Sequence, residues 1–212
     1  MRTDFDPESL SPRDFYKFLT AVVVPRPIAW VSSRSAAGVD NLAPHSFFTV
    51  ASVEPPIIQF TSVGEKDSLR NIEATGEFVV NLAPAALIEE VNASGTNFAA
   101  DVSEFDAAGL TREPSTLVRP PRVKESPAVL ECTLHRTMRM GNCVLVFGLV
   151  VRGSVSSQVL GNGRQPDVQR LDPLSRLGGD EWGTMGPVRA LKRIRASEWP
   201  GSFTPRDHPP AS

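Results

Sequence analysis

The sequence NLAPHSFF, from Asn41 to Phe48, lies at the centre of the stretch that decides the fold, which runs from Pro25 to Asn81. It places a turn rich in hydrogen-bonding side chains between two apolar runs that we expect to be strands. Pro44 lies inside this run, and because proline cannot donate a backbone hydrogen bond, the strand is expected to bulge there or to lie at a sheet edge. A bulge leaves backbone amides unpaired, so amides near Pro44 can face a ligand.

Short apolar runs bounded by turn residues lie on both sides of this turn and predict further strands. The predicted strands cover Ile28 to Ser33, Leu42 to Ser52, Ile57 to Thr61, Phe78 to Leu82, Ala128 to Met138 and Asn142 to Val155. Most of their connections are short, and few helices separate them. This order favours a mainly β fold, built as a small antiparallel barrel, over a doubly wound parallel sheet.

Three short helices are predicted between the strands. The dipeptide Ser11-Pro12 starts the first, with serine as the cap and proline at the first helical position. The second is capped by Asp67 or Ser68 and stops at Gly76, and the third covers residues 84–94. Helices are therefore few and brief beside the strands.

The chain is expected to form a single domain over residues 1–212, with its core at about residues 12–195. Residues 95–125 are rich in Ser, Thr, Asp and Pro and predict a long excursion over the surface, and loops of this length tend to be functional or interfacial. The tail, residues 196–212, is expected to be extended or mobile.

Composition excludes several classes of function. Of the 212 residues, 41% are hydrophobic and 22% charged, and the net charge of −2 gives no basic excess for nucleic-acid binding. No apolar run is long enough to span a membrane, so we expect no membrane association and a cytoplasmic location. Cys132 and Cys143 form no CxxC pair and the three histidines form no cluster, so no metal site is expected.

The sequence SVGEKDSLRN, from Ser62 to Asn71, suits a phosphate group. It lacks the glycine-rich phosphate loops, but Ser62, Lys66 and Ser68, with the first amides of the predicted helix, supply hydroxyls, a cation and backbone donors. Asp67 would repel a phosphate, so it is expected to accept amide hydrogen bonds, to neutralise Lys66 or to bind hydroxyl groups. A plain capped helix with a solvated lysine is the alternative.

The polar turn is equally open to two interpretations. Asn41 and Ser46 either face a ligand or satisfy local backbone groups, and His45 is either an ordinary loop histidine or a functional one. Trp30 is expected in the core. Arg26 stands between two prolines, whose stiff backbone aims its side chain in a fixed direction.

Together these motifs resemble the flavin reductase-like, FMN-binding split-barrel family, including its flavoredoxin type. The resemblance covers roughly residues 12–195. The segments that carry it are PRPIAWVSS (Pro25 to Ser33), NLAPHSFF (Asn41 to Phe48), KDSLRNI (Lys66 to Ile72), GEFVVNL (Gly76 to Leu82), PPRVKESPAVLEC (Pro120 to Cys132) and RLGG (Arg176 to Gly179).

The resemblance implies a homodimer of antiparallel split β-barrels with FMN in a groove near the subunit interface. The residues that it assigns to FMN are Arg26, Pro27, Ile28, Ala29 and Ser32 along the flavin, then Asn41, Leu42, Ala43, Pro44, His45 and Ser46 around the ring and ribityl chain, and Ser62, Lys66, Asp67 and Ser68 at the phosphate. Arg176 and Trp182 are candidate substrate contacts, although the family pattern leads us to expect tyrosine where Trp182 stands.

The function that this resemblance implies is an FMN-dependent oxidoreductase. It would take hydride from NAD(P)H onto bound flavin and pass electrons to free flavin, a partner oxygenase or a small acceptor. His45 is expected to orient the ring edge or the substrate without supplying an essential proton. Two alternatives are a flavoredoxin-like electron carrier that oxidises NAD(P)H slowly, and a non-catalytic FMN-binding or assembly protein.

Overall fold

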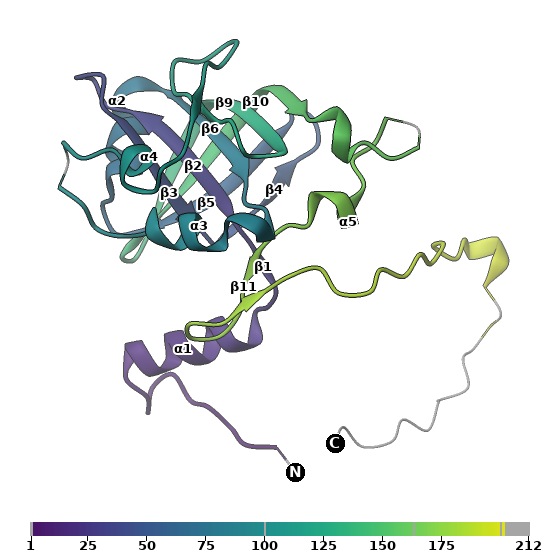
Figure 1. Ribbon diagram of the computed structural model, residues 1–212. Coiled ribbons are helices and arrows are strands. Elements are labelled where there is room, and N and C mark those ends of the chain that lie inside the picture. Colours follow the sequence, from purple (N-terminus) through teal and green to yellow (C-terminus); the bar gives the residue numbers. More distant parts are fainter. Residues whose placement is uncertain (1, 100, 163, 200, 202–212) are drawn as a thin grey trace.

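A computed structural model describes residues 2–99, 101–162, 164–199 and 201. Its main element is an antiparallel sheet of seven strands in the order β3-β2-β6-β9-β10-β5-β4, which curls into an open barrel (Figure 1). These strands are β2 (Ala29–Arg34), β3 (Asp40–His45), β4 (Phe48–Ser52), β5 (Ile57–Val63), β6 (Glu77–Leu82), β9 (Ala128–Met140) and β10 (Cys143–Val155). The prediction of a mainly β, antiparallel fold with few helices is confirmed.

The run Leu42 to Ser52, predicted as one strand, forms two. β3 ends at His45 and β4 begins at Phe48, and these strands are the two opposite edges of the sheet. The short break at Ser46 and Phe47 therefore carries the chain from one edge of the barrel to the other. Pro44 lies on the β3 edge strand opposite Trp30, which is one of the two places that its missing N–H allows.

The core has two main parts. One is centred on Phe60 and Phe78, whose rings meet edge to face with centroids 5.7 Å apart, and on Leu69 of α2 (Asp67–Thr75). The other lies under α3 (Ile88–Ala93) and contains Trp30, which is fully buried as expected. A buried indole N–H needs a partner, and Trp30 Nε1 donates to Ser94 Oγ at 2.8 Å.

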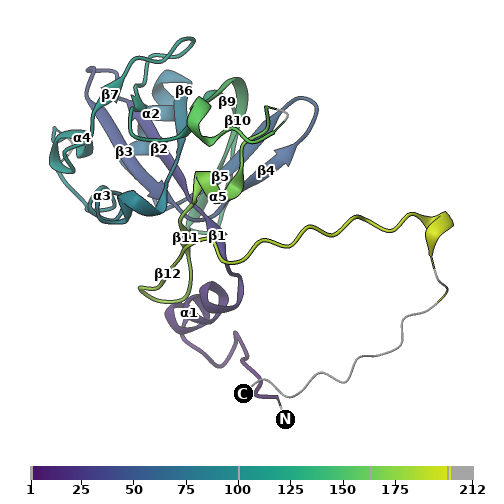
Figure 2. The ribbon, with the colours of Figure 1, turned by 45° about the vertical axis from the view of Figure 1, so that its right-hand side comes forward.

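Helix α1 (Pro12–Val22) starts as predicted, because the Ser11 hydroxyl accepts a hydrogen bond from the Asp14 amide at 3.1 Å. Figures 1 and 2 both show α1 outside the barrel, next to a small sheet. That sheet consists of β1 (Arg26–Pro27), β11 (Ser175–Arg176) and β12 (Trp182–Gly183). The second helix, α2, stops at Gly76 with φ 74°, as predicted.

The excursion over residues 95–125 is docked onto the barrel by buried side chains. It contains α4 (Glu104–Ala107), β7 (Arg112–Glu113) and β8 (Arg122–Val123). Glu131 of β9, which is fully buried, accepts hydrogen bonds from the backbone amides of Thr116 and Leu117 at 2.8 and 2.6 Å. Asn81 of β6 likewise accepts from the Val123 amide at 2.9 Å. The predicted surface excursion is therefore fixed to the barrel.

The remaining elements are short. They are η1 (Ala85–Leu87), η2 (Ser157–Val159), α5 (Val168–Leu171) and η3 (Ala196–Glu198). Most of the tail predicted over 196–212 lies outside the described residues. Within the described ranges, no helix combines the length and the apolar character that crossing a membrane requires.

Candidate functional site

A pocket of about 230 Å³ opens where the end of β3 faces the start of α2. The segment 94–98, at the front of the excursion, forms its third wall. The lining residues are Tyr16, Asn41, Ala43, Pro44, His45, Ser46, Phe47, Thr61, Val63, Lys66, Asp67, Ser68, Ser94, Gly95, Thr96, Asn97, Phe98 and Glu104. We call this the β3–α2 pocket.

The structure brings the two polar segments of the sequence to this one pocket. From the turn it contributes every predicted residue except Leu42, and from the helix start it contributes Lys66, Asp67 and Ser68. The two segments are separated by about twenty residues in sequence. The chain leaves the turn along β4 and returns antiparallel to it along β5, which brings the start of α2 back to the turn. The turn and the helix start are thus two halves of one cavity wall.

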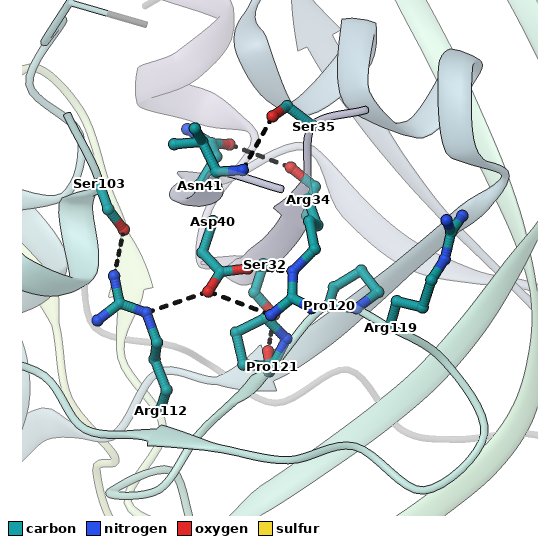
Figure 3. Close-up of polar contacts among 12 residues, drawn as sticks. Ser32, Arg34, Ser35, Asp40, Asn41, Ser103, Arg112, Arg119, Pro120 and Pro121 are labelled. Carbon is teal, nitrogen blue, oxygen red and sulfur yellow. Dashed lines mark hydrogen bonds and ion pairs between the residues drawn. The ribbon is translucent and has the colours of Figure 1, made fainter. Parts of the chain in front are cut away.

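Other predicted residues do not line this pocket. The side chains of Ala29, Ser32, Leu42 and Ser62 are buried in the barrel with no exposed surface. The Ser32 hydroxyl donates to the Pro121 carbonyl at 2.5 Å (Figure 3), and the Ser62 hydroxyl donates to the Gly64 carbonyl at 2.9 Å. These hydroxyls hold backbone segments together in this structure. Pro27 and Ile28 line a neighbouring apolar cavity.

Arg26 also lies outside the pocket. Its guanidinium donates to the carbonyls of Thr20, Val23 and Leu177, the last two at 3.1 and 2.8 Å. Two of these carbonyls belong to the C-terminal end of α1, where unpaired carbonyls favour a cation. The stiff Pro25-Arg26-Pro27 backbone therefore aims this side chain at a helix end. Burial of the guanidinium lowers the pKa of Arg26.

His45 lines the site and carries a buried polar atom. The residue lines the pocket and is only 8% exposed, and its Nε2 has no hydrogen-bond partner among the described residues. Its ring packs against Phe60 with centroids 4.6 Å apart. Burial lowers the pKa of His45 to about 4, although a hydrogen bond with the Thr61 backbone opposes this shift. The imidazole is therefore neutral at physiological pH.

The charges at the helix start are arranged so that Lys66 remains available. Asp67 pairs with Arg70 one turn along α2, while Lys66 Nζ donates to the Asn97 side chain at 2.9 Å. Lys66 is the N-cap residue, in place of the predicted Asp67 or Ser68, and no side chain caps the helix. The amides of the first turn, which lack intrahelical partners, stay open beside a lysine.

Two side chains fix the pocket wall from within. Ser68 does not direct its hydroxyl proton into the cavity but donates it to Asn41 Oδ1 at 2.9 Å. Asn41 in turn donates through Nδ2 to Glu104 Oε1 at 2.8 Å. Glu104 is 6% exposed, and burial raises the pKa of its carboxyl group above the ordinary value.

A second pocket of about 470 Å³ adjoins the first and shares Pro44, Ser46 and Gly95 with it. Its other lining residues are Ile28, Asn92, Arg176, Asp180 and Trp182. The Arg176 guanidinium lies over the Trp182 ring, 4.4 Å from its centroid, and donates to the Gly179 carbonyl at 2.7 Å. Both candidate substrate residues therefore lie next to the β3–α2 pocket.

Sequence reasoning missed the contribution of the excursion. Thr96, Asn97 and Phe98 line the pocket, and Glu104 bonds to its wall. The available signal was the length of the 95–125 segment, which indicates function but singles out no residue. Among the described residues, no group of three or more His, Cys, Asp or Glu side chains is placed to hold a metal ion.

Relatives of this chain were found by sequence and by structure. An uncharacterised protein from Halalkalibacterium halodurans is 38% identical over 205 residues, which cover 91% of this chain and 97% of that one. The crystal structure of nitrilotriacetate monooxygenase component B from Bacillus cereus is 32% identical with a TM-score of 0.84, covering 90% of this chain and 99% of that one. That of 2-nitrobenzoate 2-nitroreductase from Pseudomonas fluorescens is 29% identical with a TM-score of 0.82, covering 90% and 96%.

The family model called flavin reductase like domain matches residues 21–171, a range that contains β1 to β10 and most of the β3–α2 pocket. This match spans most of the chain, and the solved structures that resemble it share its curled antiparallel sheet. The chain belongs to the flavin reductase-like domain family.

Proposed function

We propose that this protein binds FMN in the β3–α2 pocket and is an NAD(P)H-dependent flavin oxidoreductase. The observation that carries the proposal is that the turn Asn41 to Ser46 and the helix start at Lys66 line a single cavity. A mononucleotide needs both kinds of surface, since one end is a flat ring and the other a phosphate. Bound FMN would accept hydride from a nicotinamide and pass electrons onward.

The start of α2 suits the phosphate end. Its first-turn amides have no side-chain cap, and Lys66 makes no ion pair among the described residues. Amides at a helix start together with a cation form an anion site. We propose that the amides and Lys66 hold the phosphate, with Ser68 fixed behind them by its bond to Asn41.

The end of β3 suits the ring. β3 is an edge strand, so its outward-facing backbone groups from Ala43 to His45 have no second strand to pair with in the part of the chain that the structure describes. The buried Nε2 of His45 lacks a partner among the described residues, and a polar atom in that position is stabilised when a ligand supplies a hydrogen bond. Since His45 is neutral at pH 7, we assign it an orienting role and no essential proton transfer.

The second pocket is the proposed place for the nicotinamide or the electron acceptor. It adjoins the first along Pro44, Ser46 and Gly95, so a molecule there lies against the ring end of the site. The stacked pair Arg176 and Trp182 offers a flat surface and a positive charge. Flat anionic molecules fit such a surface, and the relative from Pseudomonas fluorescens is described as a 2-nitrobenzoate nitroreductase.

We also propose that the protein is a homodimer. Helix α1 lies outside the barrel, and the helix and its C-cap residue leave apolar side chains exposed. Among them are Leu19, Val22 and Val23, which are 45%, 55% and 59% exposed. An apolar cavity of about 440 Å³ lies between this helix and the barrel. Exposed apolar surface of this kind is typical of an interface. Light scattering after size exclusion tests this: a monomer at micromolar concentration would contradict it.

Two measurements test the function. The first is titration of the flavin-free protein with FMN and with riboflavin, which lacks the phosphate; we expect FMN to bind at least tenfold more tightly. The second is anaerobic stopped-flow absorbance after mixing the FMN-loaded protein with NADH or NADPH. Rapid bleaching of the flavin band supports a reductase, and slow bleaching with fast exchange to a redox partner supports the flavoredoxin-like alternative. If the protein does not bind FMN, that result favours the alternative of a non-catalytic assembly protein.

A further inference from the structure

We infer that Glu104 is a positioning residue of the β3–α2 pocket, which fixes the side chain of Asn41 and through it joins the two halves of the pocket. This inference rests on the proposed binding of FMN there. It assigns a role to the excursion at residues 95–125, which carries Glu104 on the short helix α4.

Both carboxylate oxygens of Glu104 accept hydrogen bonds from residues of β3. Oε1 accepts a hydrogen bond from Asn41 Nδ2 at 2.8 Å, and Oε2 accepts one from the Leu42 amide at 2.9 Å. The residue is 6% exposed, so water does not replace these bonds. A buried carboxylate accepts and cannot donate while it is ionised, so it dictates which end of the Asn41 amide faces it.

This contact sets the direction of the whole Asn41 side chain. With Nδ2 held by Glu104, Oδ1 points the other way and accepts from two hydroxyls, Ser68 Oγ at 2.9 Å and Ser33 Oγ at 3.2 Å. Ser68 belongs to the start of α2, and Asn41 belongs to β3. The chain of bonds from Glu104 through Asn41 to Ser68 therefore spans the two elements that form the proposed ring and phosphate sites.

The helix that carries Glu104 has a second, independent anchor. Figure 3 shows the Arg112 guanidinium in contact with Ser103, the N-cap residue of α4, and with Asp40 of β3. Its Nε donates to Asp40 at 3.1 Å, and its terminal nitrogens donate to Ser103 at 2.8 Å and to Asp106 at 2.7 and 2.9 Å. The same guanidinium lies over the Phe105 ring, 5.0 Å from its centroid. Because Arg112 holds α4 in place, Glu104 can be changed without releasing the helix.

Two roles for Glu104 predict opposite results for Glu104→Gln. If Glu104 acted only as a negative charge near a phosphate, its removal would tighten FMN binding. A positioning role predicts weaker binding, because the new amide group has to meet one of two donors, Asn41 Nδ2 or the Leu42 amide. One donor is then left unsatisfied or the Asn41 side chain turns over, and a loss of this kind corresponds to roughly a tenfold rise in the Kd for FMN.

A reciprocal exchange separates these roles further. In Asn41→Asp with Glu104→Gln, the new glutamine donates to the new aspartate and still accepts from the Leu42 amide. The aspartate still accepts from Ser68 and Ser33, and the net charge is unchanged. We expect the double variant to bind FMN within about threefold of the wild type. Asn41→Asp alone places two carboxylates next to each other, and we expect it to bind FMN more weakly than the wild type or the double variant.

The experiment is fluorescence titration with FMN of the wild type, Glu104→Gln, Asn41→Asp and the double variant. The melting temperature of each protein is measured in parallel. Glu125→Gln is the matched control, since Glu125 lies on the same excursion, accepts from the Thr111 amide at 3.1 Å and is exposed. We expect no change in Kd for this variant. Equal or tighter FMN binding by Glu104→Gln, or no recovery in the double variant, overturns the inference.

A second measurement distinguishes this inference from the function on which it rests. In the flavin-free wild type, the Asn41 side-chain amide protons should be protected from solvent exchange in nuclear magnetic resonance spectra. Glu104→Ala, which removes both acceptor oxygens, should abolish that protection. Loss of protection supports positioning even if the wild type binds no FMN, a result that would contradict the proposed function alone. Unchanged protection in Glu104→Ala overturns the positioning role.

Discussion

The Nζ atom of Lys66 lies 2.9 Å from the Oδ1 atom of Asn97, and this contact joins the start of α2 to the segment that forms the third wall of the β3–α2 pocket. The lysine therefore stands at the boundary between a helix start and the docked excursion. Asp67 does not neutralise it, because that carboxylate pairs with Arg70. The charge is free to meet an anion that enters between the two elements.

Lys66→Met should weaken FMN binding and leave riboflavin binding almost unchanged. The lysine is exposed, so solvent and salt screen its charge, and we expect a loss of about tenfold in affinity, or about 1.4 kcal/mol. Titration with both flavins at two salt concentrations measures the effect. Asn97→Ala, which removes the contact but keeps the charge, is the control. Equal losses for FMN and riboflavin would contradict a phosphate-binding role.

His45 should make the stability of the flavin-free protein dependent on pH between 6.5 and about 4. Burial lowers its pKa to about 4, so the unfolded chain binds a proton in this range and the folded protein does not. The neutral His45 therefore contributes fully to the free energy of unfolding above pH 6.5. This contribution, up to roughly 3 kcal/mol, is lost as the pH falls towards 4.

The measurement is urea unfolding of the wild type and of His45→Gln from pH 7 to pH 4. Carboxylates titrate in both proteins, so the difference between the two curves isolates the histidine. We expect the variant to lose less stability than the wild type as the pH falls. Parallel curves would show that His45 is not buried in its neutral form.

The sequence predicted the barrel well because its strands are short apolar runs separated by turn residues, a local pattern. It did not predict that the run from Leu42 to Ser52 changes sheet edge at Ser46 and Phe47, since one continuous apolar stretch looks the same whether it is straight or broken. The Pro44 signal was informative, because a missing N–H restricts a strand wherever the chain goes.

The candidate site was predicted where proximity follows from strand pairing and missed where it depends on tertiary contacts. The turn and Lys66 meet because the antiparallel strands β4 and β5, which lie between them in sequence, bring them together. Glu104 comes 63 residues after Asn41, in a segment without periodicity, so no local pattern indicates that it reaches Asn41. The resemblance assigned Arg26 to the flavin, whereas its guanidinium contacts carbonyls at the end of α1, a tertiary contact that no local pattern indicates.

Trp182→Ala should change the use of the second pocket and leave FMN binding unchanged. The indole supports the Arg176 guanidinium 4.4 Å from its centroid, and a contact of this type contributes about 0.5–2 kcal/mol. We expect the KM for the nicotinamide or the acceptor to rise roughly twofold to thirtyfold while the Kd for FMN stays unchanged. Arg136→Ala, which removes a similar contact with Phe147, is the control. A loss of FMN instead would place Trp182 in the flavin site.

Gly148→Ala should destabilise the barrel without touching the pocket. A Cβ atom at Gly148 of β10 would lie 2.2 Å from Cζ of Phe78 and 3.2 Å from Cβ of Cys132, and both of these side chains are fully buried. Neither can move far in a packed core, so we expect a loss of about 1–3 kcal/mol or more. Gly153→Ala on the same strand is the control, because its Cβ would meet Leu130 at an ordinary 3.6 Å. Urea unfolding measures both variants, and equal stability of the two would mean that the barrel interior is looser around Phe78 than its buried position indicates.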